Sequence, residues 1–253
     1  MCMRKMSLFS LFIFIFCGIF PLFAQAREAE QDFGLSINAG VKKKIIKGLS
    51  VSVEGELRTE NKTQDLNRLT IGASVSYKPI KYFKVDTGYE FIGRYHAEHT
   101  SDKGNRIASY WVPRHRFQFS VSGILPIGDF TLSLRERYQM THSQEATASK
   151  WDADTGQALD DKVSAASNEH ILRSRLQGEY AIPDSGVTPY VSVEFYDDLA
   201  DSFALTDIKT TVGVEYEVTK HHSLEFYYRY AAEMGSSSNT DTHLLAVGYQ
   251  FSF

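Results

Sequence analysis

Three pairs of arginine residues, each pair separated by one residue, offer the clearest chemistry in the chain. They are Arg114 and Arg116, Arg135 and Arg137, and Arg173 and Arg175. A spacing of two places both guanidinium groups of a pair on the same face of a β-strand. Further along the chain, polar faces of the same kind carry Glu194, Glu215, Glu225 and Arg229. If these faces point into a barrel, we expect an arginine sector to face a glutamate sector across a narrow lumen.

This charged lumen has two functional interpretations. In the first, opposite charges neutralise one another and fill the interior, as side chains do in many small barrels. In the second, the lumen is filled with water and its transverse field selects charged solutes. The sequence leaves both interpretations open, so these arginines and glutamates are candidate lumen charges without an assigned solute.

Histidines raise the alternative of an outer-membrane hydrolase, in which a histidine activates a serine nucleophile. The residues concerned are His115, His142, His170, His221 and His222. No nucleophile motif or fixed spacing accompanies them, so we expect no catalytic residues. The carboxylate pairs Asp160–Asp161 and Asp197–Asp198 fall in or beside expected loops, where we expect them to be solvated and not to bind a metal.

The elements that carry these side chains are expected to be β-strands, because apolar residues recur at every second position from Phe33 onward. Such runs cover residues 33–42, 49–58, 69–77, 83–91, 114–121, 130–139, 172–180, 191–195, 208–218, 224–230 and 245–253. Most are about ten residues long, which suits a tilted strand that crosses a bilayer. Strands of soluble sandwiches are usually nearer five or six residues.

Short turns and longer polar connections alternate between these runs, as in outer-membrane barrels. Turns are expected near Lys47, Pro79, Gly128, Pro183 and Lys220, and longer connections at 59–67, 96–112, 141–169, 199–206 and 233–241. The longest connection, 141–169, is rich in Ser, Ala, Asp and Thr. We expect a mobile external loop without strands, or one that folds inward and constricts the lumen.

Two features depart from a regular bacterial barrel. The runs number eleven, whereas single-chain bacterial barrels usually have even strand numbers. We therefore expect ten to twelve strands, with either a hidden twelfth strand or a first run outside the wall. Glu136 falls on the apolar face of its run, where a charge in lipid costs energy, so we expect a β-bulge there or a position near the membrane interface.

The first residues are typical of a secretory signal peptide. Arg4 and Lys5 precede the apolar run 8–20, and small residues follow, so cleavage is expected after Ala24 or Ala26. Residues 1–26 are then a signal peptide and 27–253 one barrel domain. Both cysteines of the chain precede residue 26, which excludes disulfides and thiolate metal sites from the barrel domain.

Charge and hydropathy narrow the class of protein further. The chain has 27 basic and 31 acidic residues, and two of the basic ones lie in the leader, so nothing favours nucleic-acid binding. No second apolar run is long enough to span a bilayer as a helix. A membrane protein with this sequence must therefore be a closed barrel, because lipid tolerates no unpaired backbone groups.

The last residues resemble the carboxyl-terminal signal by which barrel assembly machinery recognises outer-membrane proteins. Gly248, Phe251 and Phe253 carry this resemblance, although Ala246 stands where that pattern has a polar residue. Many Phe and Tyr residues lie near the ends of the runs, as in the aromatic girdles at the two membrane interfaces.

Several short motifs are similar to those of one family. They are Pro113-Arg114-His115-Arg116-Phe117, Leu134-Arg135-Glu136-Arg137-Tyr138-Gln139, Leu172-Arg173-Ser174-Arg175-Leu176 and His222-Ser223-Leu224-Glu225-Phe226-Tyr227-Tyr228-Arg229-Tyr230. They resemble domain-of-unknown-function family 2490, a family of outer-membrane barrels found largely in Bacteroidetes. The resemblance spans nearly all of the chain beyond the leader. It implies a barrel fold and carries over no functional residues, because the family has no established activity.

Together these features predict an all-β protein, a transmembrane antiparallel up-and-down β-barrel in the outer membrane of a Gram-negative cell. The expected partners are outer-membrane lipid and, during biogenesis, the barrel assembly machinery; no nucleic acid, metal or cofactor is expected. The expected role is a small-solute pore or a plugged structural barrel. The alternatives are the hydrolase barrel and a soluble periplasmic β-sandwich. The oligomeric state is left open.

Overall fold

The computed structural model describes residues 30–234 and 240–253, in which all regular structure is β. The expected signal peptide, residues 1–26, lies outside the described residues. No helix long and apolar enough to cross a membrane occurs in the described ranges. The alternating runs therefore form strands, as the period of two predicts.

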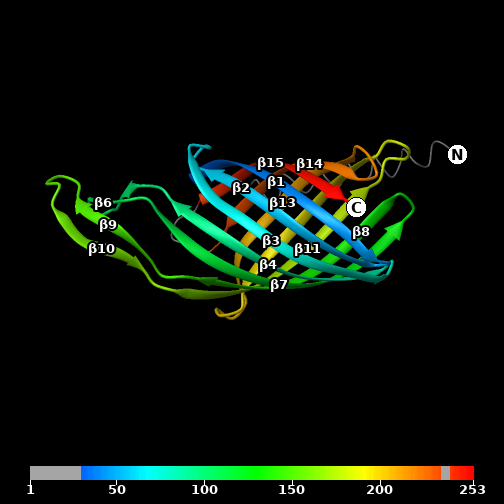
Figure 1. The fold of residues 1–253 in the computed structure, drawn as a ribbon, viewed down its shortest axis with the longest axis horizontal. Coiled ribbons are helices and arrows are strands. Elements are labelled where there is room, and N and C mark those ends of the chain that lie inside the picture. Colours follow the sequence, from blue (N-terminus) through cyan, green and yellow to red (C-terminus); the bar gives the residue numbers. More distant parts are fainter. Residues whose placement is uncertain (1–29, 235–239) are drawn as a thin grey trace. The chain divides into compact units, whose positions relative to one another are not determined.

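Eleven strands form a closed barrel, seen from the side in Figure 1. They are β1 (Glu30–Ile46), β2 (Leu49–Glu60), β3 (Asp65–Ile80), β4 (Phe83–His96), β7 (Tyr110–Ile127), β8 (Phe130–Ser143), β11 (Ser167–Tyr180), β12 (Val187–Asp198), β13 (Ala204–Glu217), β14 (His222–Glu233) and β15 (Thr240–Ser252). Their order around the ring is β1-β15-β14-β13-β12-β11-β8-β7-β4-β3-β2. A closed ring contradicts the alternative of a β-sandwich.

The ring closes with an odd number of strands because β1 and β15 run parallel. The amide of Phe253 donates to the carbonyl of Lys42 at 3.0 Å, and the amide of Lys44 donates to the carbonyl of Phe253 at 2.9 Å. Phe253 thus bonds both Lys42 and Lys44, on either side of the residue opposite to it, and this is the slanted hydrogen-bond pattern of parallel strands. Gly40 lies beside Gln250, three residues back on each strand. The count, expected between ten and twelve, is eleven, and the ring needs no further strand from the described residues.

Consecutive strands are joined alternately at the two ends of the barrel. At the end that we call the turn end lie Phe253 and the connections at 47–48, 81–82, 128–129, 181–186 and 218–221. At the end that we call the hairpin end lie the connections at 61–64, 97–109, 144–166 and 199–203, and the segment after Met234. The predicted alternation of short and long connections is confirmed, except that the connection expected at 59–67 is only a four-residue turn.

The segment 141–169 is not a loop without strands, so that prediction is wrong. It contains β9 (Ala146–Asp152) and β10 (Ala158–Ser164), which join β6 (Asn105–Ile107) and β5 (His99–Thr100) in a four-stranded sheet. Figure 1 shows β6, β9 and β10 beyond the ends of β4 and β7, away from the lumen. Neither the strandless nor the inward-folded loop occurs.

Turn chemistry and a distant partner explain these extra strands. The carboxylate of Asp152 accepts hydrogen bonds from the amide and hydroxyl of Thr155, at 2.8 and 2.9 Å, and these bonds lower its pKa. Gly156 completes the turn at a φ of 70°, a conformation that glycine adopts without strain. β9 then pairs with β6, more than 40 residues earlier in the chain. Local sequence patterns do not report such a partner.

The barrel is apolar outside and polar inside. Outward side chains such as Ile37, Ile71 and Phe117 are 62%, 59% and 54% exposed, whereas the inward Ser120 and Thr141 are each 1% exposed. Soluble domains have the opposite arrangement, because water favours buried apolar side chains. The outer surface is therefore suited to lipid.

Glu136 lies on this outward face, and no bulge accompanies it. The register of β8 with β7 and with β11 runs through Glu136 without a shift, which contradicts the expected bulge. Its carboxylate accepts a hydrogen bond of 2.6 Å from the hydroxyl of Ser174 on β11. The neighbouring serine thus partly replaces the water that lipid would exclude.

Candidate functional site in the barrel lumen

A polar cavity of about 550 Å³ lies inside the barrel and is lined from nearly every strand. Its charged lining comprises Arg58, Arg68, Arg116, Arg137, Arg173, Arg175 and Arg229 together with Glu54, Glu56, Glu90, Glu179, Glu215 and Glu225. Glycines such as Gly40 and Gly248 form part of the wall beside the parallel seam. Residues without side chains leave room there, while long arginine side chains extend from strands on the other side of the ring.

Glu194 on β12 is the centre of the most buried ion-pair cluster. Arg135 on β8 contacts one of its carboxylate oxygens, and Arg173 on β11 contacts the other at 3.0 Å. The hydroxyl of Tyr196 also donates to Glu194, at 3.1 Å. The Arg173 guanidinium lies over the Tyr196 ring at 4.5 Å, and the Lys209 ammonium lies over the same ring at 3.9 Å. Glu194 is only 6% exposed, so its charge depends on these partners.

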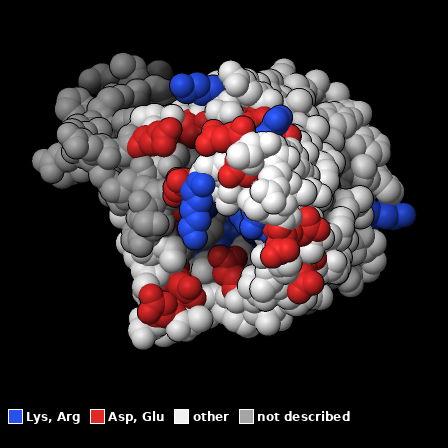
Figure 2. All heavy atoms as spheres, turned by 90° about the vertical axis from the view of Figure 1, so that its left-hand side faces the viewer, with Lys and Arg blue, Asp and Glu red and all other residues white. Residues whose placement is uncertain are grey.

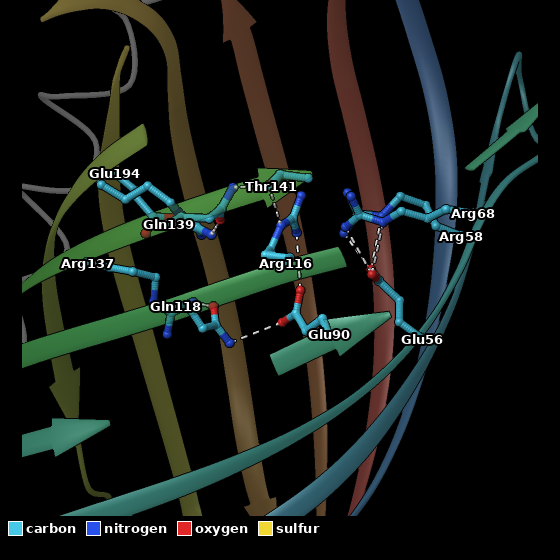
Figure 3. Close-up of polar contacts among 11 residues, drawn as sticks. Glu56, Arg58, Arg68, Glu90, Arg116, Gln118, Arg137, Gln139, Thr141 and Glu194 are labelled. Atoms are coloured by element: carbon cyan, nitrogen blue, oxygen red, sulfur yellow. Dashed lines mark hydrogen bonds and ion pairs between the residues drawn. The ribbon is translucent and has the colours of Figure 1, made fainter. Parts of the chain in front are cut away.

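Glu56 on β2 organises a second cluster in the same way. It binds Arg58 at 2.6 Å and Arg68, on β3, at 3.0 Å, and it accepts a hydrogen bond from Ser36 at 2.9 Å. Figure 3 shows this group on one side of the view, with Arg58 and Arg68 both directed at Glu56. Two arginines on one carboxylate leave a local excess of positive charge, as in the Glu194 cluster.

Glu90 on β4 links the arginines of β7 and β8. It binds Arg116 at 3.2 Å and accepts a hydrogen bond from Gln118, also at 3.2 Å. Gln118 in turn accepts one from Arg137 at 2.9 Å, and the second bond of Arg137 goes to Ser120 at 2.8 Å. Figure 3 shows this chain of side chains running from Glu90 through Gln118 towards Arg137.

Some cavity-lining charges have no ion pair within 4.0 Å among the described residues. Three are cationic and four are anionic: Arg137, Arg175, Arg229, Glu54, Glu179, Glu215 and Glu225. Arg229 donates only to the hydroxyl of Thr211, at 3.0 Å, and the Nε atom of Arg175 is buried without a hydrogen-bond partner. Glu215 and Glu225 are cross-strand neighbours, so like charges stand side by side. Glu225 accepts a hydrogen bond of 2.5 Å from the hydroxyl of Tyr190, whereas Arg175, Glu54 and Glu215 have neither an ion pair nor a side-chain hydrogen bond within the described residues.

The structure places the predicted lumen residues on inward faces, but it corrects their arrangement. The arginine strands β7, β8 and β11 and the glutamate strands β12, β13 and β14 are consecutive around the ring, so the sectors are adjacent and not opposite. Across from β8 and β11 lie β1 and β15 with Gly40 and Gly248. Arg114, Arg135 and Glu194 do not line the cavity. Arg114 lies near the hairpin end and its Nε has no hydrogen-bond partner, whereas Arg135 and Glu194 are buried in their shared ion pair.

Sequence reasoning missed the carboxylates and arginines of the first four strands. Glu54, Glu56 and Glu90 occupy the polar positions of their runs, and this parity would have identified them. Arg58 and Arg68 fall at the end of one run and just before the next, where alternation gives the weakest signal. Of the missed residues, Glu90 pairs with Arg116 of the arginine sector, whereas Glu56 pairs with Arg58 and Arg68.

The two ends of the barrel differ in charge. The connections and strand ends of the hairpin end contain Glu60, Asp65, Glu98, Asp102, Glu145, Asp152, Asp154, Asp160, Asp161, Glu169, Asp197, Asp198 and Asp201. Figure 2 views this end and shows acidic side chains around it, with basic side chains visible between them. The turn end carries Lys42, Lys43, Lys44, Lys47, Lys78, Lys81 and Lys220, together with the acidic Asp129, Asp184 and Glu217, and is therefore the more basic of the two ends.

The histidines considered for hydrolysis do not converge. His115 bonds Tyr89 at 2.7 Å and His170 bonds Tyr138 at 2.8 Å, on the outward faces of their strands, while His221 lies in a turn. In the part of the chain that the structure describes, no serine hydroxyl bonds any of them. Within residues 30–234 and 240–253, no group of three or more His, Cys, Asp or Glu side chains could hold a metal ion.

The model of the family described as "protein of unknown function (DUF2490)" matches residues 33–242, which is most of the chain. The chain belongs to the DUF2490 family. The match includes ten of the eleven barrel strands in full or nearly in full, and the first residues of β15. No curated protein matches this DUF2490 chain.

Solved structures support the fold of this DUF2490 protein. The β-domain of the Bordetella autotransporter BrkA superposes with a TM-score of 0.55 at 17% identity, over 83% of this chain and 86% of that chain. The NanC porin gives a TM-score of 0.46 at 14% identity, over 83% and 93%. The translocator domain of the autotransporter NalP from Neisseria meningitidis gives 0.43 at 13%, over 77% and 72%. The first of these likenesses establishes a shared barrel fold and nothing about solutes or activity.

Proposed function

We propose that this protein is an outer-membrane β-barrel whose water-filled lumen admits small charged solutes. The closed ring supports insertion in a membrane because it leaves no backbone edge unpaired in lipid. The exposed apolar belt, with Ile37, Ile71 and Phe117, supports it independently. The turn end is then periplasmic and the hairpin end external, since short turns face the periplasm in such barrels.

The unpaired charges of the cavity are the observation that favours a pore over a plugged barrel. A plug would pair each charge with its opposite, because an unpaired charge in a dry interior is costly. Arg175 instead stands in a cavity of about 550 Å³ without a carboxylate within 4.0 Å, and Glu215 stands beside Glu225. Charged side chains that line a water-filled lumen act on the ions that pass through it.

Ion selectivity in planar lipid bilayers tests this function. Replacing Arg175→Glu should shift the reversal potential in a salt gradient towards cations, and Glu215→Gln should shift it towards anions. Arg106→Glu is the matched control, because Arg106 lies in β6 outside the lumen and should leave selectivity unchanged. Absence of conductance in the wild type would establish a plugged barrel, and unchanged selectivity in both lumen variants would remove these residues from the conducting path.

Export and assembly complete the proposal. We propose that a cleaved leader directs the chain to the periplasm and that Gly248, Phe251 and Phe253 on β15 are read by the assembly machinery. Phe253 is 51% exposed at the turn end, where it is available to another protein. Phe253→Ala should lower the amount of folded protein in outer-membrane fractions; equal amounts would argue against this role. No catalytic activity is proposed.

A further inference from the structure

A pocket of about 440 Å³ at the turn end lies outside the lumen network described above. It is bounded by the ends of β1 and β15 and by the turn between β13 and β14. Lys42, Lys44, Lys220 and His221 supply its polar lining, and Leu49 and Phe253 supply apolar walls. Its volume falls within the range of small-molecule sites, roughly 300–1,000 Å³.

Backbone hydrogen bonds hold the frame of this pocket. The amide of Lys44 donates to Phe253, and the amide of Ser252 donates to the carbonyl of His221 at 2.7 Å. On the far side, the amide of Lys78 donates to the carbonyl of Gly48 at 2.7 Å. Gly48 has a φ of 83°, and a Cβ atom there would lie 2.5 Å from the Lys78 carbonyl oxygen. The walls are thus formed before any ligand binds.

The lysines of the pocket form no close ion pairs, although Lys42 is near enough to Glu54 and Glu215 of the lumen to interact with them electrostatically. None of the ammonium groups of Lys42, Lys44 and Lys220 lies within 4.0 Å of a carboxylate in residues 30–234 or 240–253. No Asp or Glu side chain lines the pocket. The Nδ1 atom of His221 donates to the carbonyl oxygen of Ser252 at 2.7 Å, and this bond holds the imidazole ring in the pocket wall.

We propose that this pocket binds a phosphate group. Ammonium groups bind phosphate as point charges, and three of them, two from β1 and one from the turn between β13 and β14, line one volume. Basic pockets next to apolar membrane-facing surface suit the head group of an anionic phospholipid, and Phe253 places such surface at the pocket edge. A soluble phosphate ester offers the same chemistry, so the test separates the two sources. The proposal does not depend on conduction through the lumen.

Native mass spectrometry tests the first source. The full chain is kept in a neutral detergent, phosphatidylglycerol is added, and the lipid that stays bound to the protein is measured. The triple variant Lys42→Gln/Lys44→Gln/Lys220→Gln should retain the lipid roughly tenfold less than the wild type or weaker still. The control Lys78→Gln/Lys81→Gln/Lys84→Gln removes the same charge from the same end outside the pocket and should stay within about twofold. Inorganic phosphate, followed by ³¹P line broadening, tests the second source with the same variants.

Each outcome either identifies the source of the phosphate group or overturns the proposal. Lipid retention that only the pocket variant loses supports a head-group site. Binding of inorganic phosphate that only the pocket variant loses, without lipid retention, supports a site for a soluble phosphate. Equal losses in pocket and control variants, or no binding of either probe by the wild type, overturn the proposal. Unchanged heat-modifiable electrophoretic mobility verifies that each variant is folded.

Discussion

Removing the charge of Glu194 should destabilise the barrel more than any other single carboxylate-to-amide change. Glu194→Gln keeps the shape and a hydrogen-bond acceptor but leaves Arg135 and Arg173 without their shared counter-charge. The two guanidinium groups then repel each other from either side of a neutral side chain. The side chains of Glu194, Arg135 and Arg173 are only 8%, 11% and 14% exposed, so water screens little of this repulsion.

The size of the effect follows from that burial. Breaking a fully buried ion pair by removing one partner costs about 3–5 kcal/mol, because a charge is left uncompensated. Here the neighbouring cavity can hydrate the arginines in part, and the glutamine amide still accepts one hydrogen bond. We therefore expect a loss of about 2–3 kcal/mol in the free energy of unfolding.

Guanidinium unfolding in lipid vesicles, followed by tryptophan fluorescence, measures this loss. Trp111 lies on the outward face of β7 and is 42% exposed, so its emission should report withdrawal from lipid. Glu98→Gln is the control: its partner Arg106 and Glu98 itself are 52% and 43% exposed, and such surface pairs contribute about 0–1 kcal/mol. Adding Arg135→Gln to Glu194→Gln should recover part of the stability. A Glu194→Gln midpoint equal to that of the control variant would refute the reasoning.

Two further predictions concern the outer face and the hairpin end. Glu136→Gln removes a charge that faces lipid, so the same unfolding assay should show a gain of up to about 1 kcal/mol; a loss would mean that the bond from Ser174 more than compensates for the charge. Replacing residues 146–164 by a short Gly-Ser linker should leave a folded, heat-modifiable barrel, because β9 and β10 pair only with each other and with β6. An unfolded deletion variant would show instead that this sheet is required for closure.

The strands and their inward and outward faces were predictable from the sequence because they follow from local alternation. Phe117 and Phe119 had to share one face, and Arg116 and Gln118 the other, whatever the rest of the chain did. The alternation also identified Glu136 as a charge on the wrong face. The bulge offered to explain it was wrong because a register is set by two whole strands, and both neighbours of β8 keep theirs.

Contacts between distant parts of the chain were not predictable in this way. The pairing of β6 with β9 joins two separate connections, and the parallel seam joins Lys42 to Phe253 across almost the whole chain. Alternation within a run says nothing about which strand completes the ring. The sequence therefore leaves the number of strands uncertain by one. It also predicts the glutamate sector opposite the arginine sector, whereas the two sectors are neighbours in the ring.

The arginines that Glu194 binds determine which arginine of the cavity is left without an ion pair. Arg175 is the register partner of Glu194 on β11, yet the ion pairs go to Arg173 and Arg135. Tyr196 accounts for this, because its ring holds the Arg173 guanidinium at 4.5 Å while its hydroxyl donates to the same carboxylate oxygen that Arg173 binds.

Both oxygens of Glu194 are thereby engaged before Arg175 can reach one. Arg175 is left lining the cavity without an ion pair within 4.0 Å in the described residues, which is the property that the proposed selectivity needs. The buried Tyr196 ring on β12 thus holds Arg173, and not Arg175, against the carboxylate of Glu194.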